Sequence, residues 1–509
     1  MPNTLFKYQL PILLEVDTKF NDFFKETLKL LDFAPEIEDL INHDLDQYGI
    51  NKKKIRIKDK NFITQLTPDI SELKIKETKT NSNKFYLKVG RNRMNAELVY
   101  IFLNIRGYLG SITDKRARDF MLESTTLNNY LWEKEWKIPG FTTILENVNA
   151  ISYATRLYIQ QKQLEQVHNE GIDNFKEITI DSTSIKANSC WPTDAKTLYG
   201  LLNRAFILCK KMELLKIATI NCGWINNWLN NMKKMLFQIN LTCGKKNGKR
   251  KRKKLYKKYL NLAVKIIGHL CKELEKYWNI YNPIEHKILP SNSITIKKIL
   301  SQITDDIADA YSVVEYTQLR IFDDKNIKST EKILSLSDRA ASYIIKGSRT
   351  PVLGYKAQII RSKNGFVTAI RVPPGNNSDI NEFLPTVIRS TMNTRIVPHI
   401  VNADDGYSFK QTRDILLELG SYIVSFSGSK GKKIIEDDKY NSELYKKARR
   451  NRSAVESLMF TLKYCFGLGH LRRVGIERIR EELLEKIIAY NICRKIQIQK
   501  RLEKQKKAA

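Results

Sequence analysis

Apolar residues at helical spacing dominate the first part of the chain. In the segment 19–33 large apolar side chains recur every three or four residues, as on one face of an amphipathic helix: Phe20, Phe23, Phe24, Leu28 and Leu31. Similar runs predict further helices over 96–109, 114–122 and 142–161. We therefore predict a helical N-terminal domain over residues 1–174, without a clear helix-turn-helix. It is either a DNA-binding module or a packed helical bundle.

The pattern changes at residues 175–185, where FKEITIDSTSI alternates apolar and polar positions and predicts a strand. Asp181 stands inside this strand, where propensity disfavours aspartate, so its presence needs a reason. The stretch 175–195 is therefore the first part of a sheet domain. Residues 196–335 are long and helical, too long a detour for a simple connection, and we predict that they form an insertion domain.

From residue 336 the strand pattern returns. The runs 354–361 and 366–372 predict two strands, and Asn364-Gly365 between them is a hairpin signal because both positions accept a positive φ. The later segments alternate between helix and strand, with a capping-box pattern at Ser408 and Gln411. We place these elements at 379–391 (helix), 396–403 (strand, with Pro398 as a caution), 408–419 (helix), 422–426 (strand), 452–466 (helix) and 477–507 (helix).

The order of these elements predicts an α/β fold with a mixed sheet flanked by helices. The core would be built from 175–195 and 336–480, interrupted by the basic helical insertion 196–335 and preceded by the helical N-terminal domain. Residues 481–509 would form a basic helical C-terminal tail.

Charge adds a partner to this picture. The 509 residues include 87 Lys and Arg against 55 Asp and Glu, a formal net charge of +32 at pH 7. Such an excess favours a polyanionic partner, above all nucleic acid, although a lysine-rich proteome from an AT-rich genome would account for part of it. The densest cationic run, 245–258, is either a solvated linker or a flexible loop that grips DNA phosphates through Lys249, Arg250, Lys251 and Arg252.

Cysteine and hydropathy patterns exclude other classes. None of the seven cysteines forms a CxxC pair, so neither a zinc ribbon nor a disulfide framework is indicated, and scattered cysteines fit a reducing cytosol. No stretch is apolar enough for a membrane span, and the N-terminal residues show no leader signal, so we expect a cytoplasmic protein that binds no membrane.

Candidate chemistry begins at Asp404 and Asp405, which end the predicted strand 396–403. Carboxylates at a strand tip suit a divalent metal, because oxygen ligands favour Mg²⁺ and one side stays open to substrate. Either aspartate could be the ligand on this pattern alone.

A polar helix face supplies further candidates. Arg452, Glu456 and Lys463 follow an R-x3-E-x6-K spacing that puts all three on one side of the helix. The opposite stripe is apolar and can pack on the sheet. Salt-bridged surface faces are common, so this face by itself decides nothing. Glu477 is an alternative acid in a less suitable context.

Together these motifs resemble the DDE transposases of bacterial insertion sequences, which have an RNase H-like catalytic core. The resemblance rests on IDSTSIKANS around Asp181, ADDGY around Asp404 and the spacing around Glu456, with support from WPTD and GYK. It covers about 175–195 and 336–480, and more weakly the segment 90–151 with its IPGFTTI. One departure is Arg449, where the family often has a tyrosine.

The resemblance implies that Asp181, Asp404 and Glu456 are catalytic and bind two Mg²⁺ ions, with Mn²⁺ as a substitute. It selects Asp404 over Asp405 as the ligand. It further implies DNA phosphate contacts by Arg452 and Lys463, a homodimer on the transposon ends and target DNA, and association with the bacterial nucleoid. Strand cleavage and strand transfer would be the reactions.

Two alternatives stay open on the sequence. A nuclease or resolvase with the same core would cleave DNA without strand transfer, because it uses the same carboxylates. A non-catalytic, domesticated DNA-binding protein would need none of them, and the presence of all three acids argues against it.

Overall fold

The structure is a computed structural model of the chain, and it describes residues 10–48, 93–110, 112–189, 193–214, 223–242, 247–280, 292–328, 331–336, 338–345 and 350–508. The chain divides into two compact units, with 189–343 in the second and the other described residues in the first. Trp191 and Pro192 of the WPTD motif, and residues 245 and 246 of the basic run, lie outside the described residues. None of the described helices is both long and apolar enough to cross a bilayer.

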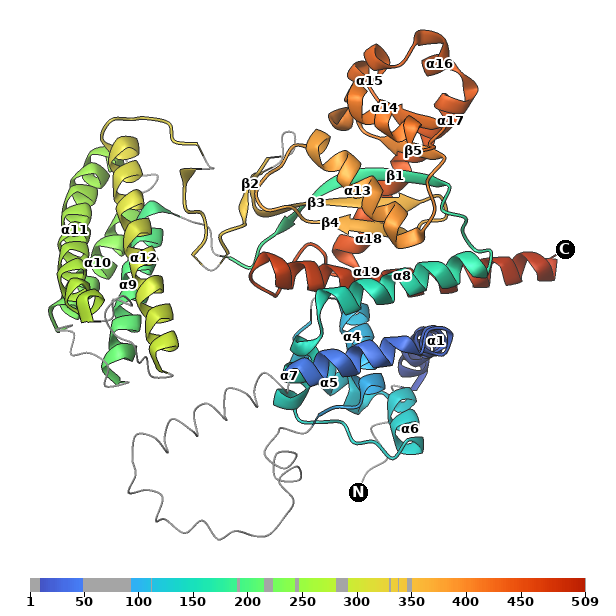
Figure 1. Cartoon of the computed structure of the whole chain (residues 1–509), viewed down its shortest axis with the longest axis horizontal. Coiled ribbons are helices and arrows are strands. Elements are labelled where there is room, and N and C mark those ends of the chain that lie inside the picture. The colour runs from blue at the N-terminus through green and yellow to red at the C-terminus, as the bar shows by residue number, and fades with distance from the viewer. Residues whose placement is uncertain are drawn as a thin grey trace, which may run out of the picture. The chain divides into compact units, whose positions relative to one another are not determined.

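A mixed sheet forms the centre of the first unit (Figure 1). Its strand order is β2-β3-β1-β5-β6, with β4 paired to β3. β1 pairs antiparallel with β3 and parallel with β5, β3 pairs antiparallel with β4, and β5 and β6 run parallel. The strands are β1 (Glu177–Lys186), β2 (Ser342–Ile344), β3 (Val352–Ser362), β4 (Val367–Arg371), β5 (Ile400–Ala403) and β6 (Ile423–Phe426).

The predicted hairpin joins β3 to β4. Gly365 adopts a φ of 97°, and the backbone N–H of Ser362 donates to the carbonyl of Phe366 at 2.8 Å. One face of the sheet packs on helices that follow the hairpin, α13 (Asp379–Thr394) and α14 (Lys410–Glu418), with Ile180, Val401 and Phe383 in a shared core. Ser378 caps α13, since its side chain accepts from the N–H of Asn381.

Helices of the N-terminal region pack around one buried helix, α4. Twelve of its residues are buried, because its sequence AELVYIFLNIRGYL is apolar on nearly every side. Its neighbours are α5, α7 and α19, and its Tyr100 hydroxyl donates to the carbonyl of Thr27 in α1. The helices of this region are α1 (Leu10–Phe33), a helix over 36–48, α4 (Ala96–Leu109), α5 (Asp114–Glu123), α6 (Thr125–Glu133), α7 (Phe141–Ala150) and α8 (Tyr153–Asn169).

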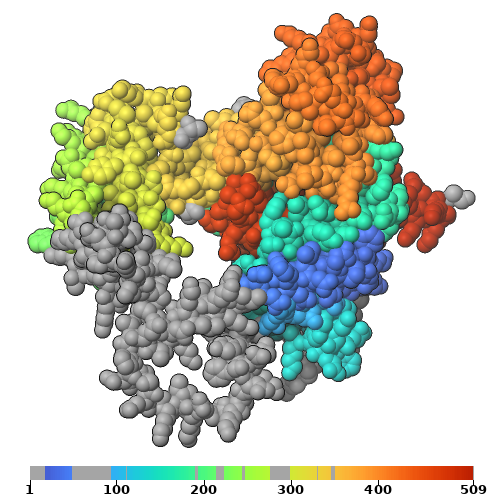
Figure 2. All heavy atoms as spheres, in the orientation of Figure 1, coloured from blue at the N-terminus to red at the C-terminus, as the bar shows by residue number. Residues whose placement is uncertain are grey.

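The last helix, α19 (Ile476–Ala508), connects this region to the sheet. A Cβ on Gly107 of α4 would lie 2.3 Å from the carbonyl oxygen of Glu485, so only glycine permits this close approach. α19 also covers the free edge of β4, because Asn491 accepts from the N–H of Val367 at 2.9 Å. The predicted basic tail 481–509 therefore begins in buried helix, and only its last turns stand out from the unit (Figure 2).

Four helices between β1 and β2 make up the second unit: α9 (Asp194–Leu214), α10 (Gly223–Leu241), α11 (Gly248–Ile280) and α12 (Asn292–Ile321). They share a core of apolar residues that includes Leu201, Ile266 and Ile303. The predicted fold class, an α/β mixed sheet interrupted by helices and preceded by a helical region, is confirmed.

Four local predictions were wrong. The helix predicted over 142–161 is two helices, because Ser152 starts a new one by capping α8. The strand predicted over 396–403 begins only at Ile400, after Pro398, because proline cannot donate to the ladder. The capping box at Ser408 does not form, since α14 begins at Lys410 without a side-chain cap. The basic run is not a loop where it is described, because its residues from Gly248 onward begin α11.

Candidate active site

Asp181 and Asp404 lie on adjacent parallel strands of the sheet. β1 and β5 pair as far as Thr179 opposite Asn402. If this register is continued by two residues, past the last pair of the ladder, Asp181 falls opposite Asp404, which is the first residue after β5. Asp404 directly follows β5 with extended backbone, so it keeps the orientation of the strand. Side chains two residues apart share a face, and neighbouring strands are about 4.8 Å apart. The sheet therefore brings these two aspartates together from distant parts of the chain.

Glu456 comes to the same place on α18 (Ala454–Tyr464), which packs on β1. The helix uses an apolar stripe for this packing, with Val455 and Leu462 fully buried and Leu458 nearly so. The predicted helix 452–466 begins with a 3-10 turn, Asn451–Ser453, before α18. The side chain of Glu456 stays 64% exposed, so the carboxylate is accessible to a ligand.

Arg452 links two of the three predicted acids. Its Nη1 lies 3.0 Å from Oδ1 of Asp404, and its Nη2 lies 3.2 Å from Oε1 of Glu456. Ser427 also donates its hydroxyl to Oδ1 of Asp404 at 3.0 Å. The guanidinium thus bridges two carboxylates and neutralises part of their repulsion. The sequence predicted Arg452 as a DNA contact and gave no sign of this bridge, because the partner Asp404 is not on the same helix.

Asp405 has a separate role next to Asp404. Its Oδ1 accepts from the backbone N–H of Gly431 at 2.9 Å, and its Oδ2 accepts from that of Lys430 at 3.3 Å. These N–H groups belong to the first turn of α15 (Ser429–Ile434). Gly428 adopts a φ of 105°, and a Cβ there would lie 2.6 Å from the Asp405 carboxyl carbon. Asp405 therefore orders the loop before α15, and its carboxylate oxygens are already engaged.

The pKa of the buried Tyr407 is raised in part by the charges of both aspartates. Burial, followed by the charges of Asp379, Asp181 and Asp404, holds the pKa of Tyr407 well above its usual range. Tyr407 therefore stays protonated, and its hydroxyl donates to Oε1 of Gln358. Tyr407 is therefore a hydrogen-bonded core residue near the acids, and it does not act as a base.

The outward face of α18 continues from Glu456 to two exposed aromatic residues. Phe460 and Tyr464 follow at four-residue spacing, are 63% and 74% exposed, and have ring centroids 4.5 Å apart. Lys463 is half-buried on the same helix.

Arg449, at the position where the resemblance leads one to expect tyrosine, stacks its guanidinium on Tyr440 with 3.8 Å between the group and the ring centre. Glu477, the alternative acid, pairs with Arg480 at 2.8 Å at the start of α19.

The basic candidates of the second unit differ among themselves. Lys249 lies 3.3 Å from Asp324, and Arg252 donates to the hydroxyl of Thr242 at 3.3 Å. Arg250 and Lys251 are exposed on the first turn of α11. Three of the four candidates are therefore exposed, and one of these, Lys249, already has an acidic partner.

The donor set fits a hard divalent cation, because three carboxylates offer only oxygen ligands. Within the described residues, however, no three Asp, Glu, His or Cys side chains lie close enough together to hold a metal ion. The Arg452 guanidinium stands between Asp404 and Glu456 as a cation would. In the described arrangement an arginine side chain therefore joins two of the three candidate carboxylates, Asp404 and Glu456.

Comparison with known proteins identifies part of the chain. Residues 317–492 match the family model described as "Transposase DDE domain", and this stretch holds five of the six strands of the mixed sheet, β2 to β6. The match includes Asp404, Arg452, Glu456 and Lys463, and it leaves out Asp181 with all of β1. No curated protein and no solved structure matches the chain. Residues 317–492 are therefore similar to a transposase DDE domain.

Proposed function

We propose that this protein is a transposase of the bacterial insertion-sequence type, which cleaves DNA at transposon ends and joins them to target DNA. The observation that carries the proposal is the parallel register of β1 and β5. It adds Asp181 to a family-matched domain that already contains Asp404 and Glu456. The net charge of +32 supports a DNA substrate. A homodimer, with one subunit for each of the two ends, completes the proposal.

In this mechanism Asp181, Asp404 and Glu456 hold two Mg²⁺ ions, and Mn²⁺ can replace them. When bound, the ions neutralise the charge that develops on the phosphate and on the leaving oxygen. Water attacks the phosphorus at the transposon end, a new P–O bond forms, and the bond to the 3′ oxygen breaks to leave a 3′-OH. This 3′-OH then attacks a target phosphodiester and releases a target 3′-OH, so no external energy source is needed.

The chain's own cations have two tasks in this scheme. Arg452 keeps Asp404 and Glu456 together before the metal binds, and then turns to a DNA phosphate. Lys463, on the same helix, contacts a neighbouring phosphate. Lys249, Arg250, Lys251 and Arg252 at the start of α11 bind the DNA backbone further from the acids, with the exposed Arg250 and Lys251 as the first contacts.

The proposal is tested with an oligonucleotide copy of the element's own end that carries a free 3′-OH, plus target plasmid and Mg²⁺. Joined product is expected, and it should disappear with EDTA and return with Mn²⁺. Cleavage of an intact copy of the end, with no joining of the copy that carries the free 3′-OH, would reduce the protein to a nuclease. Activity that persists in EDTA would contradict the metal mechanism.

Removing Arg452 should change metal affinity. We expect Arg452→Ala to bind Mg²⁺ or Mn²⁺ roughly tenfold more tightly, because two ion pairs of about 0.5–1 kcal/mol each no longer compete with the metal. Isothermal titration of the protein without DNA measures this. Arg450→Ala is the matched control, since Arg450 is an exposed arginine two residues away that does not bridge the acids. Equal affinities in both variants would show that the guanidinium does not compete with metal.

A further inference from the structure

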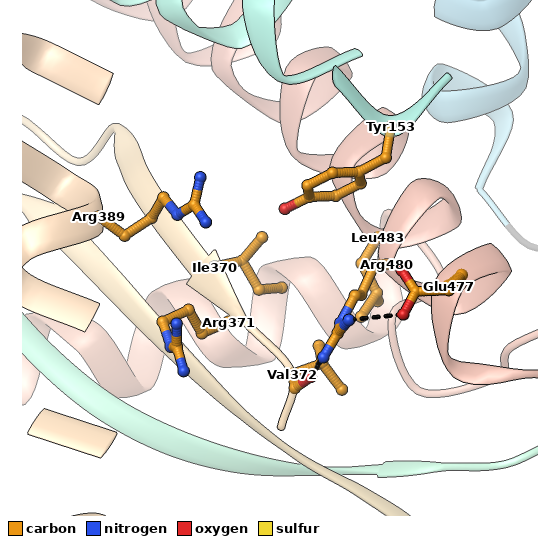
Figure 3. A pocket seen from close by; sticks show the side chains of 8 residues that line it. All are labelled: Tyr153, Ile370, Arg371, Val372, Arg389, Glu477, Arg480 and Leu483. Carbon is orange, nitrogen blue, oxygen red and sulfur yellow. Dashed lines mark hydrogen bonds and ion pairs between the residues drawn. The ribbon is translucent and has the colours of Figure 1, made fainter. Parts of the chain in front are cut away.

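A polar cavity of about 210 Å³ opens beside the end of β4 in the first unit (Figure 3). Four elements contribute to it: the start of α8, the end of β4, α13 and the start of α19. Its lining carries three arginines and a tyrosine, with one carboxylate: Arg371, Arg389, Arg480, Tyr153 and Glu477. The cavity therefore has an excess of positive charge and of hydrogen-bond donors.

Two of the arginines are held by the protein. Arg480 donates from Nε and Nη2 to the carbonyl of Val372, at 3.1 and 2.9 Å, and pairs with Glu477. Arg371 pairs with the buried Glu382 at 3.2 Å. These contacts fix the two guanidinium groups in place at the wall of the cavity. An arginine has five N–H donors, so Arg480 keeps some of them for a ligand.

Arg389 and Tyr153 have no such partners. Within the described part of the chain, neither the guanidinium nor the phenol group makes a hydrogen bond or ion pair. They extend toward each other across the cavity above Ile370 (Figure 3). Both groups are half-buried and within reach of water, and an anionic acceptor can replace that water with charge-assisted hydrogen bonds.

The ligand class follows from this lining. The Arg389 guanidinium and the Tyr153 hydroxyl both donate hydrogen bonds, which suits a tetrahedral oxyanion such as a phosphate. Ile370 lies next to them and can contact the carbon atoms of a sugar attached to that phosphate. The volume accepts one phosphate with part of its sugar, and the open side lets a strand continue. A phosphodiester of DNA fits these features.

The sheet also relates the cavity to the acids. Across the antiparallel ladders, Asp181 pairs with Ile359 of β3, and Ile359 pairs with Ile370 of β4. Ile370 is thus two strands from Asp181, roughly 10 Å at the usual strand spacing. We propose that this cavity binds a backbone phosphate of the DNA strand, a short distance along the strand from the phosphate that reacts. The inference rests on the proposed function for the identity of its ligand.

Arg389→Ala tests the site with little risk to the fold, because the Arg389 guanidinium makes no hydrogen bond or ion pair within the described part of the chain. The full chain is titrated onto a labelled DNA duplex of arbitrary sequence, without divalent metal, and anisotropy gives the affinity at several salt concentrations. We expect the slope of log affinity against log salt to fall by about 1, and the affinity to fall roughly fivefold at about 0.1 M salt. Tyr153→Phe should weaken binding about two- to fivefold with the slope unchanged, because it removes a donor without charge.

Arg478→Ala is the matched control, since it removes an exposed arginine from α19 outside the cavity lining. If Arg389→Ala leaves the slope unchanged, or changes it only as much as the control does, the phosphate site is overturned. Inorganic phosphate that raises the melting temperature of the wild type but not of Arg389→Ala, with equal DNA slopes, would also overturn it and define a small-anion site. A lowered slope together with a failed strand-transfer assay would reject the proposed function and leave the DNA phosphate site standing.

Discussion

Asp404→Asn is expected to lower the rate of end cleavage at least roughly a thousandfold, equivalent to about 4 kcal/mol of transition-state stabilisation. Asparagine has the same shape, so the hydrogen bond from Ser427 can remain. The carboxylate charge that the metal requires is lost. Cleavage of a labelled transposon end in Mg²⁺ measures the rate, and the melting temperature shows that the fold is retained.

The neighbouring aspartate provides the matched control for this prediction. Asp405→Asn removes the charge that accepts from the N–H groups of Lys430 and Gly431. It should destabilise the loop before α15 by about 1 kcal/mol, as the loss of a helix cap does, and leave cleavage within about tenfold of wild type. The opposite result, with Asp405→Asn inactive and Asp404→Asn active, would show that Asp405, and not Asp404, is the metal ligand.

The second large effect is expected at Glu485, at the centre of a buried charge cluster. Nε of Arg106 and Nε of Arg156 each lie 2.7 Å from its carboxylate, and Nη2 of Arg473 lies 3.7 Å away. All three arginines are well buried, and Arg156 is fully so. Glu485→Gln should therefore destabilise the first unit by about 3–5 kcal/mol, because buried guanidinium groups lose their counter-charge. Thermal and urea unfolding measure the loss.

The same glutamate predicts a dependence of stability on pH. Burial by itself raises the pKa of Glu485, but the charges of Arg106, Arg473 and Arg156 outweigh it and lower the pKa to about 2 from 4.5. The stabilisation is therefore complete above the unfolded pKa near 4.5 and is lost as the pH falls from there toward 2. The advantage of wild type over Glu485→Gln should shrink across this window and stay constant from pH 5 to 8.

Glu503 offers the control on the same helix, because it is exposed near the end of α19. Glu503→Gln should change the unfolding free energy by less than about 0.5 kcal/mol. A Glu485→Gln protein as stable as this control would mean that the arginines find other partners, and the cluster would then not hold α4, α8 and α19 together.

Local pattern was enough for much of the fold. Alternation located β1 and the β3–β4 hairpin, and Asn364-Gly365 marked the turn, because strand period and turn chemistry are properties of neighbouring residues. Where local signals competed, the prediction was wrong: Ser408 resembles a helix cap, but the chain first makes the 3-10 turn Asp405–Tyr407. The segment from 481 has the composition of a solvated tail, yet its first half is buried against α4 and α8.

The sequence alone determined the local elements and the cationic character of the chain, and it predicted three candidate acids, since each depends on residue type and short spacing. Tertiary structure decided how they meet. The parallel pairing of β1 and β5 carries Asp181 and Asp404 on neighbouring strands or directly after them. The docking of α18 lets Arg452 bridge Asp404 and Glu456, and α4 and α8 bring Arg106 and Arg156 to Glu485 of α19. Charges select partners by distance in space, and residues separated by 379 positions, such as Arg106 and Glu485, leave no periodic trace in the sequence.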